Sequence, residues 1–254
     1  MVHHVRPAAL PILVCLAALP PGGHAAAADC APPQDLSVRD ATPSLLTVRP
    51  DAGRVHFVKD GLVQAGCPGP APFCLSPGFV TAGDAVVVTA TRPGYVCATF
   101  TGPPPNAVSI SGWLPRAILG RATAATATPT DWSGDWQSGP EQSIAIREAA
   151  GGGIELRGAA TVGARDPERV KRGAVESGGF DVSLAPSGGS VAFLIDTDGN
   201  PLSYDAERAK SDSLCALRLW RLGPYLVVAD NLQCGGGGGG VTFTGVYRSA
   251  AKPS

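Results

Sequence analysis

The sequence predicts an all-β protein with two small domains, an N-terminal barrel at 29–120 and a C-terminal antiparallel β-barrel at 131–249. Three observations lead to this prediction. No stretch keeps an apolar period of 3.6 residues, whereas short β-branched runs recur between Gly, Pro and Asp residues. The chain also contains 33 glycines and 24 prolines, which interrupt long helices. The residues between Arg121 and Asp131 are small and uncharged, so we expect a linker at 121–130.

The first 28 residues have the three-part layout of a secretory signal peptide. A basic start precedes the apolar stretch Ala8–Leu19, and the small residues Ala25–Ala28 follow it. The apolar stretch has only twelve residues, whereas a membrane span needs about 20. We therefore expect a signal peptide at 1–28, no membrane insertion after its cleavage, and a periplasmic or secreted mature protein. Lipid anchoring is the less favoured alternative, because Asp29 rather than a small residue precedes Cys30.

The charge of the mature chain argues against nucleic acid as a partner. Removing the leader takes away Arg6 and no acidic residue, so the formal net charge moves from −1 to −2. Nucleic acids and anionic membranes both favour a concentrated basic surface. We expect neither as a partner.

Six cysteines remain after the leader, and in an exported chain they predict three disulfides. A zinc site is the alternative, but no CxxC pair exists and the single remaining histidine, His56, lies eleven residues before the nearest of the six. We therefore expect no metal and no other cofactor. The preferred pairings are Cys67 with Cys74, Cys30 with Cys97, and Cys215 with Cys234, although the first four cysteines allow three connectivities.

The strands expected in the first domain follow its β-branched runs. They are Leu45–Val48, Val55–Val58, Ala85–Thr89, Tyr95–Phe100 and Val108–Leu114. A turn at Gly83-Asp84, a hairpin at Arg92-Pro93-Gly94 and the ending Gly112-Trp113-Leu114-Pro115 accompany them.

With these features, residues 37–120 resemble the bacterial extracytoplasmic Src-homology-3-like domain, a small five-stranded barrel. The resemblance implies binding of cell-wall peptide or of a protein partner in a groove between loops. The tyrosine-rich first-loop motif is absent, and the cysteine-containing stretch GLVQAGCPGPAPFC takes its place. Recognition of proline-rich peptides is therefore not expected. Trp113 is a candidate binding residue, with burial in the core as the alternative reading.

The second domain is expected to be a meander of short strands. They are Ser143–Arg147, Ile154–Thr161, Gly173–Val175, Phe180–Leu184, Ser190–Asp196, Leu214–Leu222, Tyr225–Asp230 and Val241–Tyr247. The glycine run 235–240 lacks the Lys-Ser/Thr ending of a phosphate loop, so we expect it to be a connection. The Cys-Gly-strand ending is similar to that of exported bacterial proteins of unassigned role.

The domain begins with DWSGDW, in which alternation along a strand would put Trp132 and Trp136 on one face. This Gly-x-Trp resembles the start of lipocalin-like and avidin-like barrels, where the tryptophan closes or lines one end. Both tryptophans are therefore candidate binding residues. The alternative is that they fill an ordinary barrel core.

The stretch DTDGNPLSYDAE at 196–207 places oxygen-bearing side chains as an EF-hand loop does. Pro201 occupies the sixth place, where an EF-hand has glycine, and Asp198-Gly199 is a strong hairpin signal. We therefore expect a turn between two strands. Asp196 and Asp198 remain candidate binding residues, either as a weak cation site or as part of a rim at one barrel mouth.

These patterns favour a binding protein over an enzyme. The mature sequence has no HExxH motif, no glycine-elbow serine and no cysteine left unpaired, so no catalytic residue is assigned. The leading hypothesis is an exported non-enzymatic protein that recognises cell-envelope material, such as peptidoglycan fragments, or an exported partner protein. The alternatives are an inhibitor of an exported lysozyme or peptidase, and a hydrolase that acts through the carboxylates of the 196–207 loop.

Overall fold

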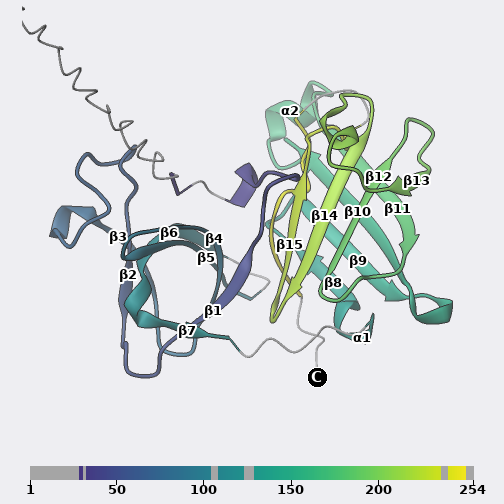
Figure 1. Cartoon of the computed structure of the whole chain (residues 1–254). Coiled ribbons are helices and arrows are strands. Elements are labelled where there is room, and N and C mark those ends of the chain that lie inside the picture. Colours follow the sequence, from purple (N-terminus) through teal and green to yellow (C-terminus); the bar gives the residue numbers. More distant parts are fainter. Residues whose placement is uncertain (1–28, 31–32, 104–107, 123–128, 236–239, 250–254) are drawn as a thin grey trace, which may run out of the picture.

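The computed structural model describes residues 29–30, 33–103, 108–122, 129–235 and 240–249 (Figure 1). The predicted leader, most of the predicted linker and residues 236–239 of the glycine run lie outside the described residues. The chain is all-β, as the sequence predicted, and its strands form two antiparallel sheets. None of the described helices is both long enough and apolar enough to cross a membrane.

Sheet A contains seven strands in the order β3-β2-β6-β5-β4-β1-β7. All five strands predicted for the first domain are present, whereas β3 and β7 were not predicted. The strands are β1 (Ser44–Val48), β2 (Val55–Val58), β3 (Leu75–Val80), β4 (Ala85–Arg92), β5 (Tyr95–Thr101), β6 (Ser109–Pro115) and β7 (Leu119–Arg121). Three short 3-10 turns accompany them, η1 (Pro33–Asp35), η2 (Pro72–Cys74) and η3 (Arg116–Ile118).

Sheet B contains nine strands in the order β11-β10-β9-β8-β16-β15-β14-β12-β13 and forms a nearly closed antiparallel barrel (Figure 1). Its strands are β8 (Gly134–Gln137), β9 (Gln142–Glu148), β10 (Ile154–Val162), β11 (Glu176–Leu184), β12 (Ser190–Ile195), β13 (Pro201–Ser203), β14 (Cys215–Leu222), β15 (Tyr225–Asp230) and β16 (Gly245–Ser249). Its helices and 3-10 turns are α1 (Pro129–Trp132), η4 (Ala150–Gly152), α2 (Pro167–Lys171) and η5 (Arg208–Lys210).

In sheet B one predicted strand is absent and another starts later than predicted, each for a local reason. No strand forms at Gly173–Val175, because the chain leaves α2 there and Gly173 has a φ of 66°. Helix α2 itself was not predicted, although Asp166 caps it by accepting hydrogen bonds from the backbone N–H groups of Glu168 and Arg169. The last strand begins at Gly245 rather than Val241, since the backbone before it is held by Asp230 instead of a neighbouring strand.

The interior of sheet B is a packed aromatic and aliphatic core. Phe180 lies edge-on to Phe243, with 4.9 Å between ring centroids, and to Phe193, with 5.8 Å. The ring of Phe180 lies directly over Gly158 of the paired strand, where any Cβ would overlap it. Trp132 and Trp136 belong to the same core. The barrel is therefore filled by side chains from its own strands and termini.

A further apolar cluster joins the two sheets. Along β15, Leu226 and Val228 point into the barrel, whereas Tyr225, Val227 and Ala229 point outward, and all six residues of the strand are buried. The outward residues pack with Val87 of β4 and with the partly buried Leu45 and Ala85 of sheet A. The Tyr225 hydroxyl also donates a hydrogen bond to the carbonyl of Ala85, 2.7 Å away. We call this cluster the shared core.

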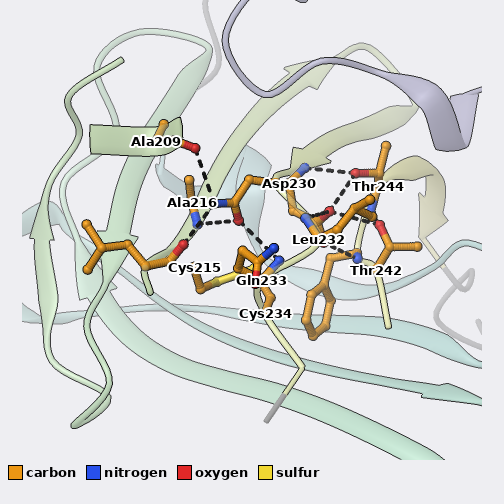
Figure 2. Close-up of a disulfide and its surroundings, with 12 residues drawn as sticks. Ala209, Cys215, Ala216, Asp230, Leu232, Gln233, Cys234, Thr242 and Thr244 are labelled. Atoms are coloured by element: carbon orange, nitrogen blue, oxygen red, sulfur yellow. Dashed lines mark hydrogen bonds between the residues drawn. A yellow bond between two sulfur atoms is a disulfide. The ribbon is translucent and has the colours of Figure 1, made fainter. Parts of the chain in front are cut away.

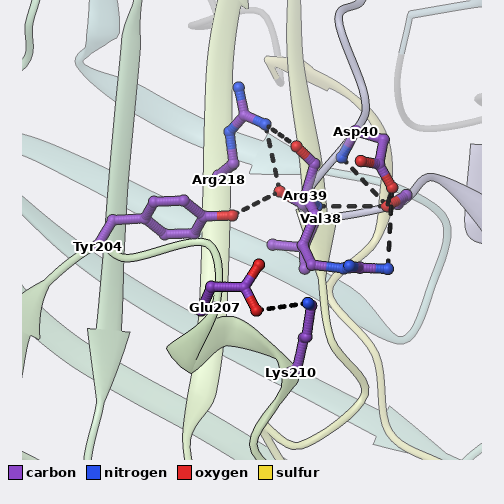
Figure 3. A network of polar contacts seen from close by, with 8 residues as sticks. Val38, Arg39, Asp40, Tyr204, Glu207, Lys210 and Arg218 are labelled. Carbon is purple, nitrogen blue, oxygen red and sulfur yellow. Dashed lines mark hydrogen bonds and ion pairs between the residues drawn. The ribbon is translucent and has the colours of Figure 1, made fainter.

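The segment that precedes β1 extends the shared core over the outside of the barrel. Val38 is buried there, and its carbonyl accepts hydrogen bonds from the Tyr204 hydroxyl at 3.0 Å and from the Arg218 guanidinium at 3.3 Å (Figure 3). Arg218 also donates to the carbonyl of Arg39 at 2.9 Å. The disulfide between Cys30 and Cys97 ties the start of this segment to β5. The N-terminal segment thus bridges both sheets.

Candidate functional site

The three candidate tryptophans lie inside the protein. Trp113 is fully buried in sheet A, and its indole N–H donates to the Asp60 carboxylate at 2.8 Å. Trp132 lies at the end of α1 rather than in the same strand as Trp136, because β8 begins only at Gly134. Both rings are nevertheless in the barrel core, where the Trp136 indole N–H donates to the Trp132 carbonyl at 3.0 Å. None of the three presents a face to solvent.

The acidic stretch forms the turn between β12 and β13. One oxygen of the Asp196 carboxylate accepts hydrogen bonds from the backbone N–H groups of Asp198 and Asn200, at 3.0 and 2.8 Å. Gly199 supplies the left-handed residue of the turn, with a φ of 86°. The hydrogen bond from the Asn200 N–H is the main cause that lowers the pKa of Asp196. Asp196 therefore shapes a hairpin, and among the described residues no group of three His, Cys, Asp or Glu side chains could hold a metal ion.

The three disulfides are those preferred from the sequence: Cys30–Cys97, Cys67–Cys74 and Cys215–Cys234. Figure 2 shows the last of them beside a polar network at the end of β15. Within it, the Asn231 amide donates to the carbonyl of Leu214 at 2.8 Å, and its oxygen accepts from the N–H of Ala216 at 2.9 Å. This network fixes the loops at one mouth of the barrel.

A groove of about 580 Å³ lies between this network and the N-terminal segment. Its walls include Ser37, Arg39, Lys210 and Leu232. Leu232 is about half exposed and adopts a φ of 64°, in a region that leucine rarely occupies. Within the described residues it is the only position other than glycine with a positive φ. The groove has a mixed polar and apolar lining that includes aspartates as well as the basic residues Arg39 and Lys210.

A more distinctive feature lies on sheet A, in the connection between β2 and β3. Cys67 and Cys74 close this connection with a disulfide, yet Leu62 is 81% exposed, Val63 73% and Phe73 55%. Strand β3 adds two more exposed large apolar residues, Leu75 and Phe79, which alternate with less exposed residues along the strand. We call these five residues the β3 surface. Figure 1 shows that the β2–β3 connection projects on the side of sheet A away from sheet B.

Asp60 anchors the start of this connection. One of its carboxylate oxygens accepts hydrogen bonds from the Trp113 indole at 2.8 Å and from the backbone N–H of Cys30 at 3.0 Å. The other accepts from the N–H of Leu62 at 2.9 Å. Burial on its own raises the pKa of Asp60, but these hydrogen bonds and the charge of Arg92 together outweigh burial and lower it below the ordinary value of 3.8. The ionised carboxylate is therefore the form that holds the connection.

This depressed pKa gives a pH-dependent contribution to stability. A carboxylate with a lowered folded-state pKa stabilises the fold above its unfolded-state pKa, and the contribution is lost as the pH falls through the folded-state value. We expect the difference in free energy of unfolding between the wild type and Asp60→Asn to be constant near neutral pH and to shrink below about pH 4. Urea unfolding of both proteins across this range measures it. A difference that stays constant down to low pH would contradict the role given to the ionised group.

Cationic side chains accompany the phenylalanines of the β3 surface. The guanidinium of Arg54 lies 4.3 Å from the ring centroid of Phe79. The half-buried Lys59 donates from its Nζ to the carbonyl of Phe73 at 2.9 Å. His56 contacts Phe79 as well, with 5.8 Å between ring centroids.

The sequence reasoning missed the β3 surface. A signal was present, since a loop rich in Gly and Pro contains GLV and PFC, and large apolar residues are unusual in an exposed connection. The two cysteines of this stretch predicted a cross-link, but they did not predict the exposure of the side chains beside it.

No family model, curated protein or solved structure matches this chain.

Proposed function

We propose that this chain is an exported, non-enzymatic binding protein that docks a partner protein through the β3 surface. The observation that carries the proposal is the exposure of large apolar side chains on a connection closed by a disulfide. Exposed apolar groups on soluble proteins are normally scattered, whereas clustered ones are typical of interaction sites. The β3 surface lies away from the shared core, so a partner can reach it.

The disulfide supports binding through pre-organisation. A loop that is ordered before it meets its partner loses less conformational entropy on binding than a free loop does. The Cys67–Cys74 bridge closes the connection at one end, and Asp60 holds it at the other. Leu62, Val63 and Phe73 are therefore displayed on a constrained support.

Export is supported by the disulfides and by the leader-like start of the sequence. Three bridged cysteine pairs are compatible with an oxidising compartment. A periplasmic or secreted location is part of the proposal, with cleavage of the predicted signal peptide near residue 28.

The two family resemblances remain part of the proposal. For the Src-homology-3-like domain, the support is the sequence pattern of the Gly83-Asp84 turn, the Arg92-Pro93-Gly94 hairpin and the GWLP ending at 112–115. For the lipocalin-like or avidin-like barrel, it is the Gly-x-Trp at 134–136. Because that barrel is filled by its own side chains, the proposed binding takes place on the outside of the molecule.

A direct test compares two variants of the mature protein. Leu62→Asp combined with Phe73→Asp should weaken binding to an extracytoplasmic protein fraction by more than about 100-fold, since each buried apolar side chain contributes about 1.5–3 kcal/mol. Val170→Asp is the matched control, because Val170 is an exposed apolar residue of helix α2, outside the β3 surface. Binding is measured with the immobilised protein, and circular dichroism checks that each variant is folded.

The same variants decide between classes of partner. Co-sedimentation with purified peptidoglycan tests envelope material, and titration against lysozymes and peptidases tests inhibition. Binding that survives the double substitution, or that falls equally in Val170→Asp, would rule out the β3 surface as the docking site. A one-to-one loss of hydrolase activity that requires Leu62 and Phe73 would identify the partner as an enzyme and the chain as its inhibitor.

A further inference from the structure

The β3 surface has an uneven distribution of charge. From Gly53 to Val80 the only formally charged side chains are Arg54, Lys59 and Asp60. Asp60 is buried, and its carboxylate is engaged by Cys30, Leu62 and Trp113 within the protein. The charge that this region presents to solvent is therefore positive, although the chain as a whole is slightly acidic.

Among the described residues, no carboxylate lies within ion-pair distance of Arg54 or Lys59. In the part of the chain that the structure describes, neither Arg54 nor Lys59 forms an ion pair, whereas Arg49, Arg147 and Arg157 each pair with an aspartate. Arg54 lies over Phe79 instead, and Lys59 donates to the Phe73 carbonyl. A guanidinium stacked on an aromatic ring retains N–H donors at its edge that can bind a carboxylate.

The two aromatic and cationic pairs lie at opposite ends of β3. Phe79 and Arg54 are beside the end of β3 that pairs with the start of β2. At the other end, Phe73 lies just before β3, and Lys59 follows Val58 of β2, which pairs with Leu75. Between them, β3 presents alternate exposed side chains. An extended partner segment that lies along β3 would therefore meet apolar groups along its length and a positive charge near each end.

We propose that the β3 surface recognises an acidic polypeptide segment, in which apolar side chains pack on Leu62, Phe73, Leu75 and Phe79 and carboxylates bind Arg54 and Lys59. This inference rests on the proposed function and adds the chemistry of the partner. The register shift between β2 and β3, together with Pro77, disfavours regular strand pairing at this edge. Recognition therefore depends on side chains.

The test uses three fluorescent peptides of equal length and fluorescence anisotropy with the mature protein. The first has Leu and Phe at alternate positions along its length and Glu near each end, the second has Lys in place of Glu, and the third has Ser in place of Leu and Phe. The first should bind at least about ten-fold more tightly than either of the others, and its binding should weaken as salt is raised. Arg54→Glu combined with Lys59→Glu should remove this preference and shift it toward the Lys peptide.

Lys171→Glu combined with Arg172→Glu is the matched control, because it changes the net charge equally at two exposed positions at the end of helix α2. Equal binding of the Glu and Lys peptides, both weakened by Leu62→Asp with Phe73→Asp, would overturn the acidic specificity and leave the proposed docking surface intact. Binding of the Glu peptide that neither double variant changes would overturn both. Binding of purified peptidoglycan through Arg54 and Lys59, with no binding of any peptide, would replace the acidic polypeptide with an anionic glycan.

Discussion

Replacing Asp230 with alanine should lower the free energy of unfolding by about 3–5 kcal/mol, one of the two largest effects we expect in this protein. Asp230 is buried at the end of β15, and its carboxylate accepts hydrogen bonds from the N–H groups of Leu232 and Phe243 and from the hydroxyls of Thr242 and Thr244 (Figure 2). Alanine would leave these donors without their acceptor. Because Phe243 completes the barrel core, the substitution should also loosen that core.

Chemical unfolding of the purified protein measures this effect. Asp212→Ala is the control. Asp212 and Asp230 both line the groove between the N-terminal segment and the end of β15, but Asp212 is exposed, so its loss should change the free energy of unfolding by less than about 0.5 kcal/mol. Asp230→Asn should fall between them, because the amide can keep the oxygen that accepts from Leu232, Thr242 and Thr244 while its NH2 group faces the N–H of Phe243. An Asp230→Ala protein as stable as Asp212→Ala would show that the network does not hold the C-terminal segment.

The second large effect concerns the shared core. Val227→Asp would place an unpaired carboxylate between β15 and sheet A, at a fully buried position. We expect a loss of more than about 3 kcal/mol in the free energy of unfolding. Val87→Asp, introduced from the sheet A side, should have a similar effect because Val87 belongs to the same cluster. The exposed Val170→Asp serves as the control for a charge placed on valine.

The strands and the disulfides were largely predictable because their signals are local. Alternating and β-branched runs identified β1, β5 and β10, and the position of the cysteines in two groups led to the observed pairings. Helix α2 was missed although Asp166-Pro167 is a good start signal, because its single turn has no apolar periodicity. The structure was needed to locate α2.

The shared core was not predictable from local patterns, although one clue existed. The first five residues of β15, YLVVA at 225–229, are continuously apolar, as expected for a strand covered on both faces, whereas an ordinary barrel strand alternates. The outward face of β15 is covered by Val87 and Leu45, which are more than 130 residues away in the chain. Sequence patterns alone do not identify such a partner.

The candidate binding residues also could not be assigned from sequence patterns alone. Trp113, Trp132 and Trp136 were selected because aromatic residues serve both binding and packing, and the structure places all three in cores. Exposure decides between the two roles, and it depends on the complete fold. Leu62 and Phe73 passed unnoticed because an apolar residue in a loop is recognised as a surface feature only after the loop has been placed.

We expect the shared core to make the two sheets one cooperative unit, with the β3 surface on its exposed face. Hydrogen exchange of the wild type and of Val227→Asp, followed by mass spectrometry, tests it most directly. The claim predicts that amides of β5 in sheet A and of β10 in sheet B, neither of which contains the substituted residue, lose protection by the same free energy. If β10 loses protection while β5 keeps the protection it has in the wild type, the two sheets unfold independently and the claim is contradicted.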